Sequence, residues 1–297
     1  MLCDIRIIPY LQADPGDLKM PDTYGEIAMK SILLHVHDDE GLESRLAAAL
    51  AVAHQQRGHL ACIQVTPVSD YVATDPFGGM YELKALFENL AERAAGVRTR
   101  VEARLARENV ECDWSIHDDG VAASIVSRSR LADLTVLSLA DHTRSKSVHP
   151  LPLVADVSLH SRTPVLAVPI AGSAFDPAGI AMIAWNGSPE AAHAVRAALP
   201  LLKMASAVHV VSFDEDQNFP MADVRRYLAG HGVSVECTER KLDGKTVGEA
   251  ICRASALHTA AYVVMGAYGH SRFREAVLGG VSRHMLAHNQ VPLLLAH

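Results

Sequence analysis

The chain has 297 residues, of which 49% are hydrophobic and 21% are charged, and its formal net charge is −7. This length suggests about two domains of ~150 residues, each able to bury a core. The acidic balance, with no Lys/Arg-rich run, argues against a nucleic-acid or anionic membrane surface as the main partner. No stretch approaches the ~20 apolar residues of a membrane span, and no signal peptide is visible, so we expect a cytoplasmic protein.

Composition also divides the chain. Residues 1–28 hold several prolines and glycines without a clear period, which predicts an N-terminal extension. A cluster of Pro, Gly and Ser predicts a linker over residues 171–178. The first domain is then expected over residues 29–170 and the second over 179–297. Five scattered cysteines, none in a C-x-x-C pair, are typical of reduced buried thiols.

The predicted elements alternate between strand and helix in both domains. In the first, strands are expected at 32–36, 60–65, 111–116, 134–139 and 165–168, with a long helical segment between Met80 and Arg107. In the second, strands are expected at 180–185, 207–213, 233–237, 261–265 and 291–296, with helices at 189–203, 221–229, 247–257 and 281–287. Continuous apolar strands separated by helices indicate a parallel sheet covered on both faces. We therefore predict an α/β protein of two tandem, doubly wound, five-stranded, Rossmann-like domains.

The two domains are predicted to be copies of one unit. The segment beginning at Ala132 resembles the segment beginning at Ala260, an offset of 128 residues. The same offset superposes Gly120 on Gly248 and Pro164 on Pro292. The starts of the two units, from Ser31 and from Ile180, also share a pattern, at a different offset. Internal self-similarity of this kind indicates a repeated supersecondary unit.

One loop combines the features of a phosphate-binding site. It runs from Gly266 to Ser282, after an apolar strand. Glycines at the carboxyl end of a parallel strand let a ligand approach the backbone. Gly279 and Gly280 open the next helix, whose unpaired N–H groups and dipole favour an anion. The loop lacks the Gly-Lys-Ser/Thr of a Walker loop and the spacing of a dinucleotide fingerprint.

In this loop the sequence resembles the ATP-binding members of the universal stress protein family. They carry glycine, two residues, glycine, nine residues, then glycine with Ser or Thr. Gly266, Gly269 and Gly279 have that spacing, but Gly280 stands where Ser or Thr is usual. After the first strand, Asn186 occupies the position of an aspartate that lies beside the adenosine. The resemblance covers both units and implies an adenine nucleotide alpha hydrolase-like fold.

The resemblance implies ATP, with Mg²⁺ on its phosphates, as the ligand of the second domain, and neither catalytic residues nor protein metal ligands are expected. Arg272 and Arg274 are candidates for phosphate contacts. The residues expected to form the nucleotide site are Ala184, Trp185, Asn186, Gly187, Ser188, Val211, Phe213, Gly266, Ala267, Gly269, His270, Gly279, Gly280, Val281 and Ser282.

The first domain is expected not to bind ATP in this manner. The offset of 128 places Ser138, Asp141, Leu151 and Pro152 where the second domain has its four glycines. A carboxylate replaces a phosphate-binding position, and proline lacks the N–H donor. A separate group, His35, His37, Asp38 and Asp39, has the residue types of a metal site but no second cluster at a defined spacing.

These features predict a non-catalytic protein that binds an adenine nucleotide and acts in the stress response through a protein partner. By resemblance, strands 165–168 and 291–296 would pair as an internal pseudo-dimer, and a homodimer of the whole chain is a further expectation. Two alternatives stay open: a scaffold that binds no nucleotide, and a slow ATPase.

Overall fold

The computed structural model describes residues 28–66, 80–139, 153–171, 174–213, 219–269 and 280–297, without the side chains of residues 80–86. The first half alternates strand and helix, as predicted. Its strands are β1 (Ser31–Val36), β2 (His59–Val65), β3 (Cys112–His117), β4 (Leu134–Leu139) and β5 (Val165–Pro169). Its helices are α1 (Leu42–Gln56), α3 (Met80–Arg107), α4 (Val121–Arg128) and α5 (Leu153–His160), with a 3₁₀ turn, η1 (Ser129–Leu131).

The second half repeats this order. Its strands are β6 (Ile180–Ala184), β7 (Ala207–Phe213), β8 (Glu236–Arg240), β9 (Tyr262–Gly266) and β10 (Leu293–Ala296). Its helices are α6 (Pro189–Leu202), α7 (Met221–Gly230), α8 (Val247–Leu257) and α9 (Gly280–His288). Ser188 caps α6 by accepting a hydrogen bond from Ala191 N, and Pro189 follows at the first helical position, as the sequence predicts.

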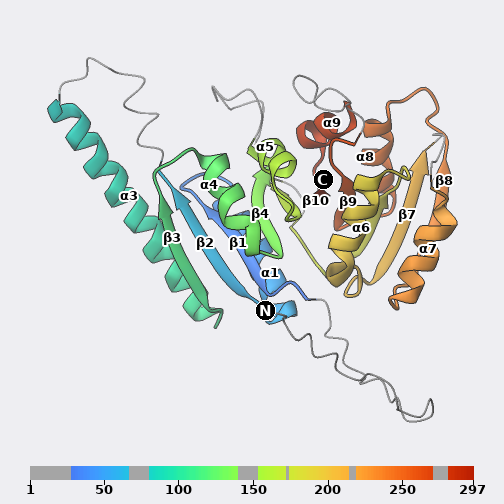
Figure 1. Cartoon of the computed structure of the whole chain (residues 1–297), viewed down its shortest axis with the longest axis horizontal. Helices are drawn as coiled ribbons and strands as arrows, with labels where there is room; N and C mark the ends of the chain where they lie inside the picture. The colour runs from blue at the N-terminus through green and yellow to red at the C-terminus, as the bar shows by residue number, and fades with distance from the viewer. Residues whose placement is uncertain (1–27, 67–79, 140–152, 172–173, 214–218, 270–279) are drawn as a thin grey trace, which may run out of the picture.

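The strands form one sheet with the order β3-β2-β1-β4-β5-β10-β9-β6-β7-β8. Each half is a parallel, doubly wound sheet, which confirms the predicted fold class. The halves meet in the middle of the molecule, where β5 and β10 pair antiparallel, with Leu294 opposite Leu166 (Figure 1). These are the two segments expected to pair from the family resemblance. The pairing covers two apolar edges that would otherwise be exposed.

Helices cover both faces of the sheet. One hydrophobic core lies under α1 and α6, and it includes Leu46 and Val195. The other lies under α5, α8 and α9, and it includes Val157 and Met285. Since strand residues are buried on both faces, the central strands read as continuous apolar runs.

One predicted strand was placed wrongly. The sequence suggested a strand over 233–237, but β8 begins at Glu236. Val233 instead closes α7, because its N–H donates to Leu228 O while the N–H of Gly232 donates to Ala229 O. Gly232 has a φ of +79°, so this is a Schellman cap in which the two buried side chains of Val233 and Leu228 make the apolar contact. The predicted helix end at Gly230 lies two residues before this capping glycine.

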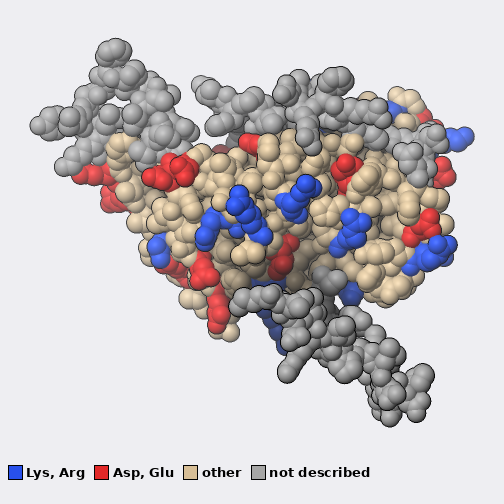
Figure 2. All heavy atoms as spheres, in the orientation of Figure 1, with Lys and Arg blue, Asp and Glu red and all other residues tan. Residues whose placement is uncertain are grey.

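The described surface carries charges of both signs (Figure 2). On the face shown in Figure 2, acidic and basic side chains of the described residues are interspersed. No helix in the described ranges is long and apolar enough to cross a membrane.

Cys62 is buried, which raises the pKa of its thiol to about 12. Cys112, Cys237 and Cys252 are only half-buried, rather than buried as expected, and all four are free thiols.

Candidate functional site

The candidate site lies between the carboxyl ends of β6 and β9. These two strands are neighbours, and Ala184 at the end of β6 is paired with Met265. The chain leaves β6 toward β7 on one side, while β9 lies on the other. The crevice is therefore the topological switch point of the second half, where open α/β sheets bind their ligands.

Two glycines let helix α6 approach the end of β9. A Cβ on Gly266 would lie 2.5 Å from Ala191 N and 2.9 Å from Glu190 Cβ. A Cβ on Gly269 would lie 2.4 Å from Glu190 Oε2 and 3.5 Å from Ser188 Oγ. At Gly266 the contacted atoms include backbone, so that position requires glycine in this packing, whereas at Gly269 the contacted atom is the end of the Glu190 side chain, which can turn away.

The turn between β6 and α6 is held by local hydrogen bonds. Asn186 Oδ1 accepts from Ser188 N at 3.1 Å, and Gly187 takes a positive φ of +72°. An asparagine in this arrangement forms an Asx turn that sets the entry into the helix. The polar end of Asn186 therefore lies at the crevice with one acceptor already engaged.

The start of α9 borders the crevice from the other side. No described atom lies within 4 Å of the place that a Cβ on Gly280 would take. About two turns of helix follow, and the N–H groups of the first turn have no partner within the helix itself. Ser282 is buried and its Oγ accepts from Tyr268 N at 3.3 Å, where Tyr268 has a φ of +63°. Val281 packs half-buried against the core. The sequence-predicted His270 and Gly279, and both Arg272 and Arg274, lie outside the described residues.

The structure separates the apolar residues that the sequence grouped together. Val211 and Phe213 are buried on the same face of the sheet as Ala184. Trp185 belongs to the opposite face, where its Nε1 donates to Phe219 O at 3.3 Å. Ala184, Val211 and Phe213 thus come together beside the crevice, and the Trp185 ring does not.

The last strand is tied to the loop. Ala267 N donates to Ala296 O at 2.8 Å, so this N–H is already used by the sheet. His297 Nδ1 lies 2.9 Å from Ala267 O, and the carbonyl of His297 lies 2.9 Å from His193 Nδ1. Ala267 therefore holds the strand end in place, and its backbone N–H and C=O groups are already engaged within the protein and are not open to a ligand.

Comparison with known proteins agrees with this geometry. Residues 180–297 match the model of the Universal stress protein family. These residues form a universal stress protein domain. No curated protein matches the chain.

Solved structures extend the likeness to the whole fold. A universal stress protein from Archaeoglobus fulgidus DSM 4304 is 16% identical, with a TM-score of 0.69, over 91% of this chain and 96% of that one. A Pseudomonas aeruginosa UCBPP-PA14 protein described under the same family name is 17% identical, with a TM-score of 0.57, over 91% and 93%. At these identities the likeness shows the fold, and it shows it for both halves of the chain.

A residue that the sequence reasoning missed lies inside the crevice of the universal stress protein domain. The carboxylate of Glu190, in the first turn of α6, is directed at Gly269. Its Oε2 atom is buried and has no hydrogen-bond partner among the described residues. The two units, aligned from Ser31 and Ile180 at an offset of 149 residues, place Glu190 opposite Gly41. This alignment could have found Glu190, because the second half has a carboxylate where the first half has glycine.

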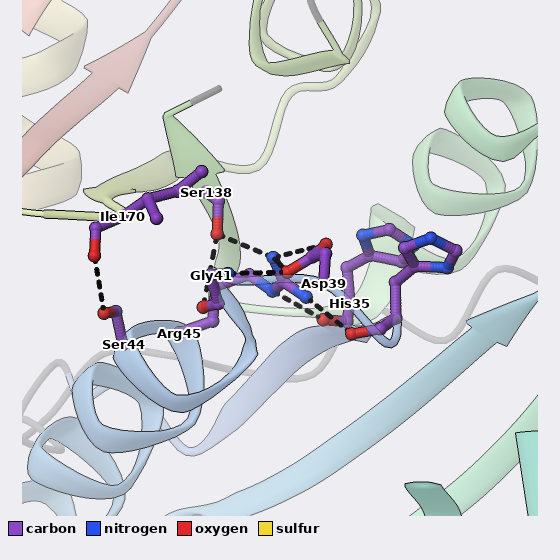
Figure 3. A network of polar contacts seen from close by, with 8 residues as sticks. His35, Asp39, Gly41, Ser44, Arg45, Ser138 and Ile170 are labelled. Atoms are coloured by element: carbon purple, nitrogen blue, oxygen red, sulfur yellow. Dashed lines mark hydrogen bonds and ion pairs between the residues drawn. The ribbon is translucent and has the colours of Figure 1, made fainter. Parts of the chain in front are cut away.

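The equivalent crevice of the first half is filled by an arginine. The same offset places Arg45 on Ala194, and both are buried in their helices. Arg45 Nη1 donates to Asp39 Oδ1 at 2.9 Å and to Ser138 Oγ at 2.6 Å. Arg45 Nε donates to His35 O at 3.0 Å, and Nη2 donates to His37 O at 3.2 Å. Figure 3 shows the guanidinium enclosed by these acceptors at the ends of β1 and β4.

The buried side chain of His35 lies at the same strand end. His35 stands where the second half has Ala184, and its ring lies nearly parallel to that of His37, with centroids 6.0 Å apart. Burial lowers the pKa of His35 well below its ordinary value, and Arg45 and His37 lower it further. The ring is therefore neutral at pH 7. Ser138, expected to replace a glycine, makes its hydrogen bond inside this network.

The acidic residues of this region are paired with arginines. Asp39 is bound by Arg45, and Asp38 lies 3.4 Å from Arg93 Nη2 and 3.0 Å from Arg100 Nη2. In the described part of the chain, no group of three or more His, Cys, Asp or Glu side chains is arranged to hold a metal ion. Asp141, Leu151 and Pro152 lie outside the described residues.

Proposed function

We propose that the second half of the chain binds an adenine nucleotide, ATP in the first place, in the crevice between β6 and β9. The observation that supports this proposal is the difference between the two crevices. Ala184, Gly269 and Gly280 leave one crevice lined by small residues, while His35, Arg45 and Ser138 fill the other. The first half then binds no nucleotide in this manner, and the chain has a single site.

The residues present fit the parts of ATP. The adenine would lie beside Ala184, Val211 and Phe213, at the ends of β6 and β7. The phosphates would lie on the backbone of Gly269 and on the first turn of α9 from Gly280, where unpaired N–H groups and the helix dipole favour an anion.

The role proposed for the bound nucleotide is not catalytic. Occupancy of the site would favour one arrangement of the nearby surface, which a protein partner of the stress response then recognises. Such a switch requires that the nucleotide bind the two arrangements with different affinity. A nucleotide-free scaffold is the competing function, and it is favoured by Asn186, whose uncharged side chain is engaged in the turn before α6.

A pair of matched variants tests the nucleotide site. Gly280→Asp places a carboxylate in open space at the start of α9, where it favours the helix and repels phosphate. Gly120→Asp makes the same change before α4 in the first half, also in open space. ATP affinity, measured by isothermal titration calorimetry with MgCl₂, should fall at least about a hundredfold in the first variant and stay unchanged in the second.

The same preparations decide between the functions. A wild-type protein that contains no nucleotide and takes up no ATP would support the scaffold and contradict the proposal. Phosphate release that is measurable in the wild type and absent in Gly280→Asp would identify a slow ATPase at this loop. Equal rates in both proteins would exclude the loop as the source of any ATPase activity.

A further inference from the structure

Glu190 places a negative charge inside the crevice proposed for the phosphates. Its Oε2 atom would lie 2.4 Å from a Cβ at Gly269, so the carboxylate rests on the backbone of that glycine. Oε2 is buried, and no described residue donates a hydrogen bond to it. A buried carboxylate oxygen without a donor is costly, since such groups are normally paired.

The first half of the chain shows how the same crevice accommodates a carboxylate. Asp39 lies at the matching strand end and is neutralised by Arg45, at 2.9 Å and 3.1 Å from its two oxygens. The second half has a carboxylate in Glu190, but the residue equivalent to Arg45 is Ala194. One copy therefore contains its own cation. In the other, the described residues offer none to Glu190.

We infer that Glu190 is a ligand for a divalent cation, and that the second half binds ATP only as its magnesium complex. This inference rests on the proposed nucleotide site. Mg²⁺ is held in proteins by one or two carboxylates together with phosphate oxygens. An ion between Glu190 and the phosphates neutralises both groups. Without it, the carboxylate repels metal-free ATP. Glu190 thus makes the site selective for the metal complex.

ATP affinity measured with and without the metal tests this directly. Titrations of the full chain with ATP are compared in excess MgCl₂ and in EDTA. Wild-type affinity should fall at least about tenfold in EDTA. Glu190→Gln keeps the shape and removes the charge, so metal-free ATP should bind it more tightly than it binds the wild type. Magnesium should then have little effect on the variant. Glu190→Asp keeps the charge and should keep the dependence on magnesium.

Two controls separate a metal ligand from a structural role. Glu239→Gln removes an exposed charge from β8 in the same half and should behave as the wild type. Mn²⁺ can replace Mg²⁺ as a paramagnetic probe. Its electron paramagnetic resonance spectrum in the protein–ATP complex should change between wild type and Glu190→Gln, because one protein oxygen leaves the coordination sphere.

The outcomes are distinct. Wild-type ATP affinity that is equal in MgCl₂ and EDTA overturns this inference and leaves the nucleotide site standing. Magnesium-independent binding that is lost in Glu190→Gln also overturns it, because the carboxylate would then be neutralised by a cation of the chain itself. If neither the wild type nor any variant binds ATP in either buffer, the proposed function and the inference fail together.

Discussion

The two halves of the molecule differ in the side chains that line the same crevice. Both place a helix N-terminus over the ends of the first and fourth strands of a five-stranded unit. In the second half the crevice is bordered by Ala184 and Ala194, while in the first His35 and Arg45 occupy those positions. The comparison teaches that one fold can line the same crevice with small residues or fill it with large ones through a few substitutions at fixed positions.

The comparison also separates packing from binding among the glycines. In the second half, glycine stands on the strand side, at Gly266, and faces Glu190 of the helix. In the first half, it stands on the helix side, at Gly41, and faces Ser138 of the strand. Each copy thus has one glycine where helix and strand approach closely. Gly266 is explained by this approach alone, so Gly269 and Gly280 are the better indicators of a phosphate site.

The largest effect is expected from removing the arginine that fills the first crevice. Arg45→Ala leaves Asp39, Ser138 and two carbonyl groups without their shared donor. Breaking a buried pair costs ~3–5 kcal/mol, and because the Asp39 side chain is 37% exposed we expect the lower end, about 3 kcal/mol. Urea unfolding followed by Trp114 fluorescence, in a Trp185→Phe background, measures the loss in the first half.

A matched arginine provides the control for that loss. Arg104, on α3, pairs with Glu108 just past the end of the helix, and the two side chains are 40% and 33% exposed. Arg104→Ala should therefore cost only about 0.5 kcal/mol. If Arg45→Ala proved no more destabilising than Arg104→Ala, the network of Figure 3 would not hold the first crevice closed.

The next effect concerns the two close-packed glycines. Gly266→Ala brings a Cβ within 2.5 Å of the Ala191 backbone, so helix α6 must shift. We expect a loss of about 2 kcal/mol, within the usual range for overpacking. Gly41→Ala meets the side-chain oxygen of Ser138 at 2.3 Å and should cost about 1 kcal/mol, because that side chain can turn.

A double variant tests whether the contact with Ser138 causes the loss in Gly41→Ala. Ser138→Gly in the Gly41→Ala background removes the contacted atom and should recover part of the loss in urea unfolding. A Gly266→Ala protein as stable as wild type would show that the close approach of α6 and β9 is not what requires glycine there.

A smaller effect appears as a difference in pH dependence. The pKa of His35 is lowered in the folded protein, chiefly by burial, while an unfolded histidine titrates near ~6.5. Below about pH 6.5 the unfolded chain takes up a proton that the folded one does not. The free energy of unfolding contributed by His35 is therefore constant above that pH and falls below it, by up to ~1.4 kcal/mol per pH unit.

His35→Ala, the residue that the second half carries at this position, removes this titration. Urea unfolding of the first half at about pH 7.5 and about pH 5.5 should show roughly 1 kcal/mol less acid destabilisation in the variant than in the wild type. An identical pH dependence in both proteins would mean that His35 takes up a proton as readily in the folded state as in the unfolded state.

The smallest effect is a gain. Gly120 precedes α4 without a side-chain cap, whereas Thr246 and Glu249 form a capping box at α8. Gly120→Asp supplies a carboxylate to the start of α4 and should stabilise the first half by about 0.3 kcal/mol. Thr246→Ala should destabilise the second half by about 1 kcal/mol. Thermal unfolding of the two variants gives the signs, which should be opposite.

The sequence predicted the fold because local and global signals agree. Apolar runs gave the strands, the 128-residue offset identified the repeat, and strand pairing followed from the family resemblance. The strand at β8 was predicted too early in the chain because Val233 is apolar. Its side chain packs in the cap of α7 and does not belong to a strand. Such a cap depends on Gly232 adopting a positive φ, which an apolar pattern does not reveal.

The site was predicted in part, and the missing residues share a cause. Glycines and the helix start are local features, so the loop was visible. Arg45 was not singled out, because in the sequence it only precedes an apolar run, and a buried charge in a helix looks like any surface arginine until its acceptors are known. Glu190 looked like an ordinary acidic residue in a first turn. Only the superposition of the two copies distinguishes them.

The number of nucleotides bound per chain tests the central claim most directly. Equilibrium dialysis of the purified full chain against ATP and MgCl₂ at saturation should give one equivalent. That equivalent should be lost in Gly280→Asp and kept in Gly120→Asp. Two equivalents would show that the first crevice also binds nucleotide despite Arg45 and His35. No bound ATP in the wild type would contradict the assignment of the second crevice.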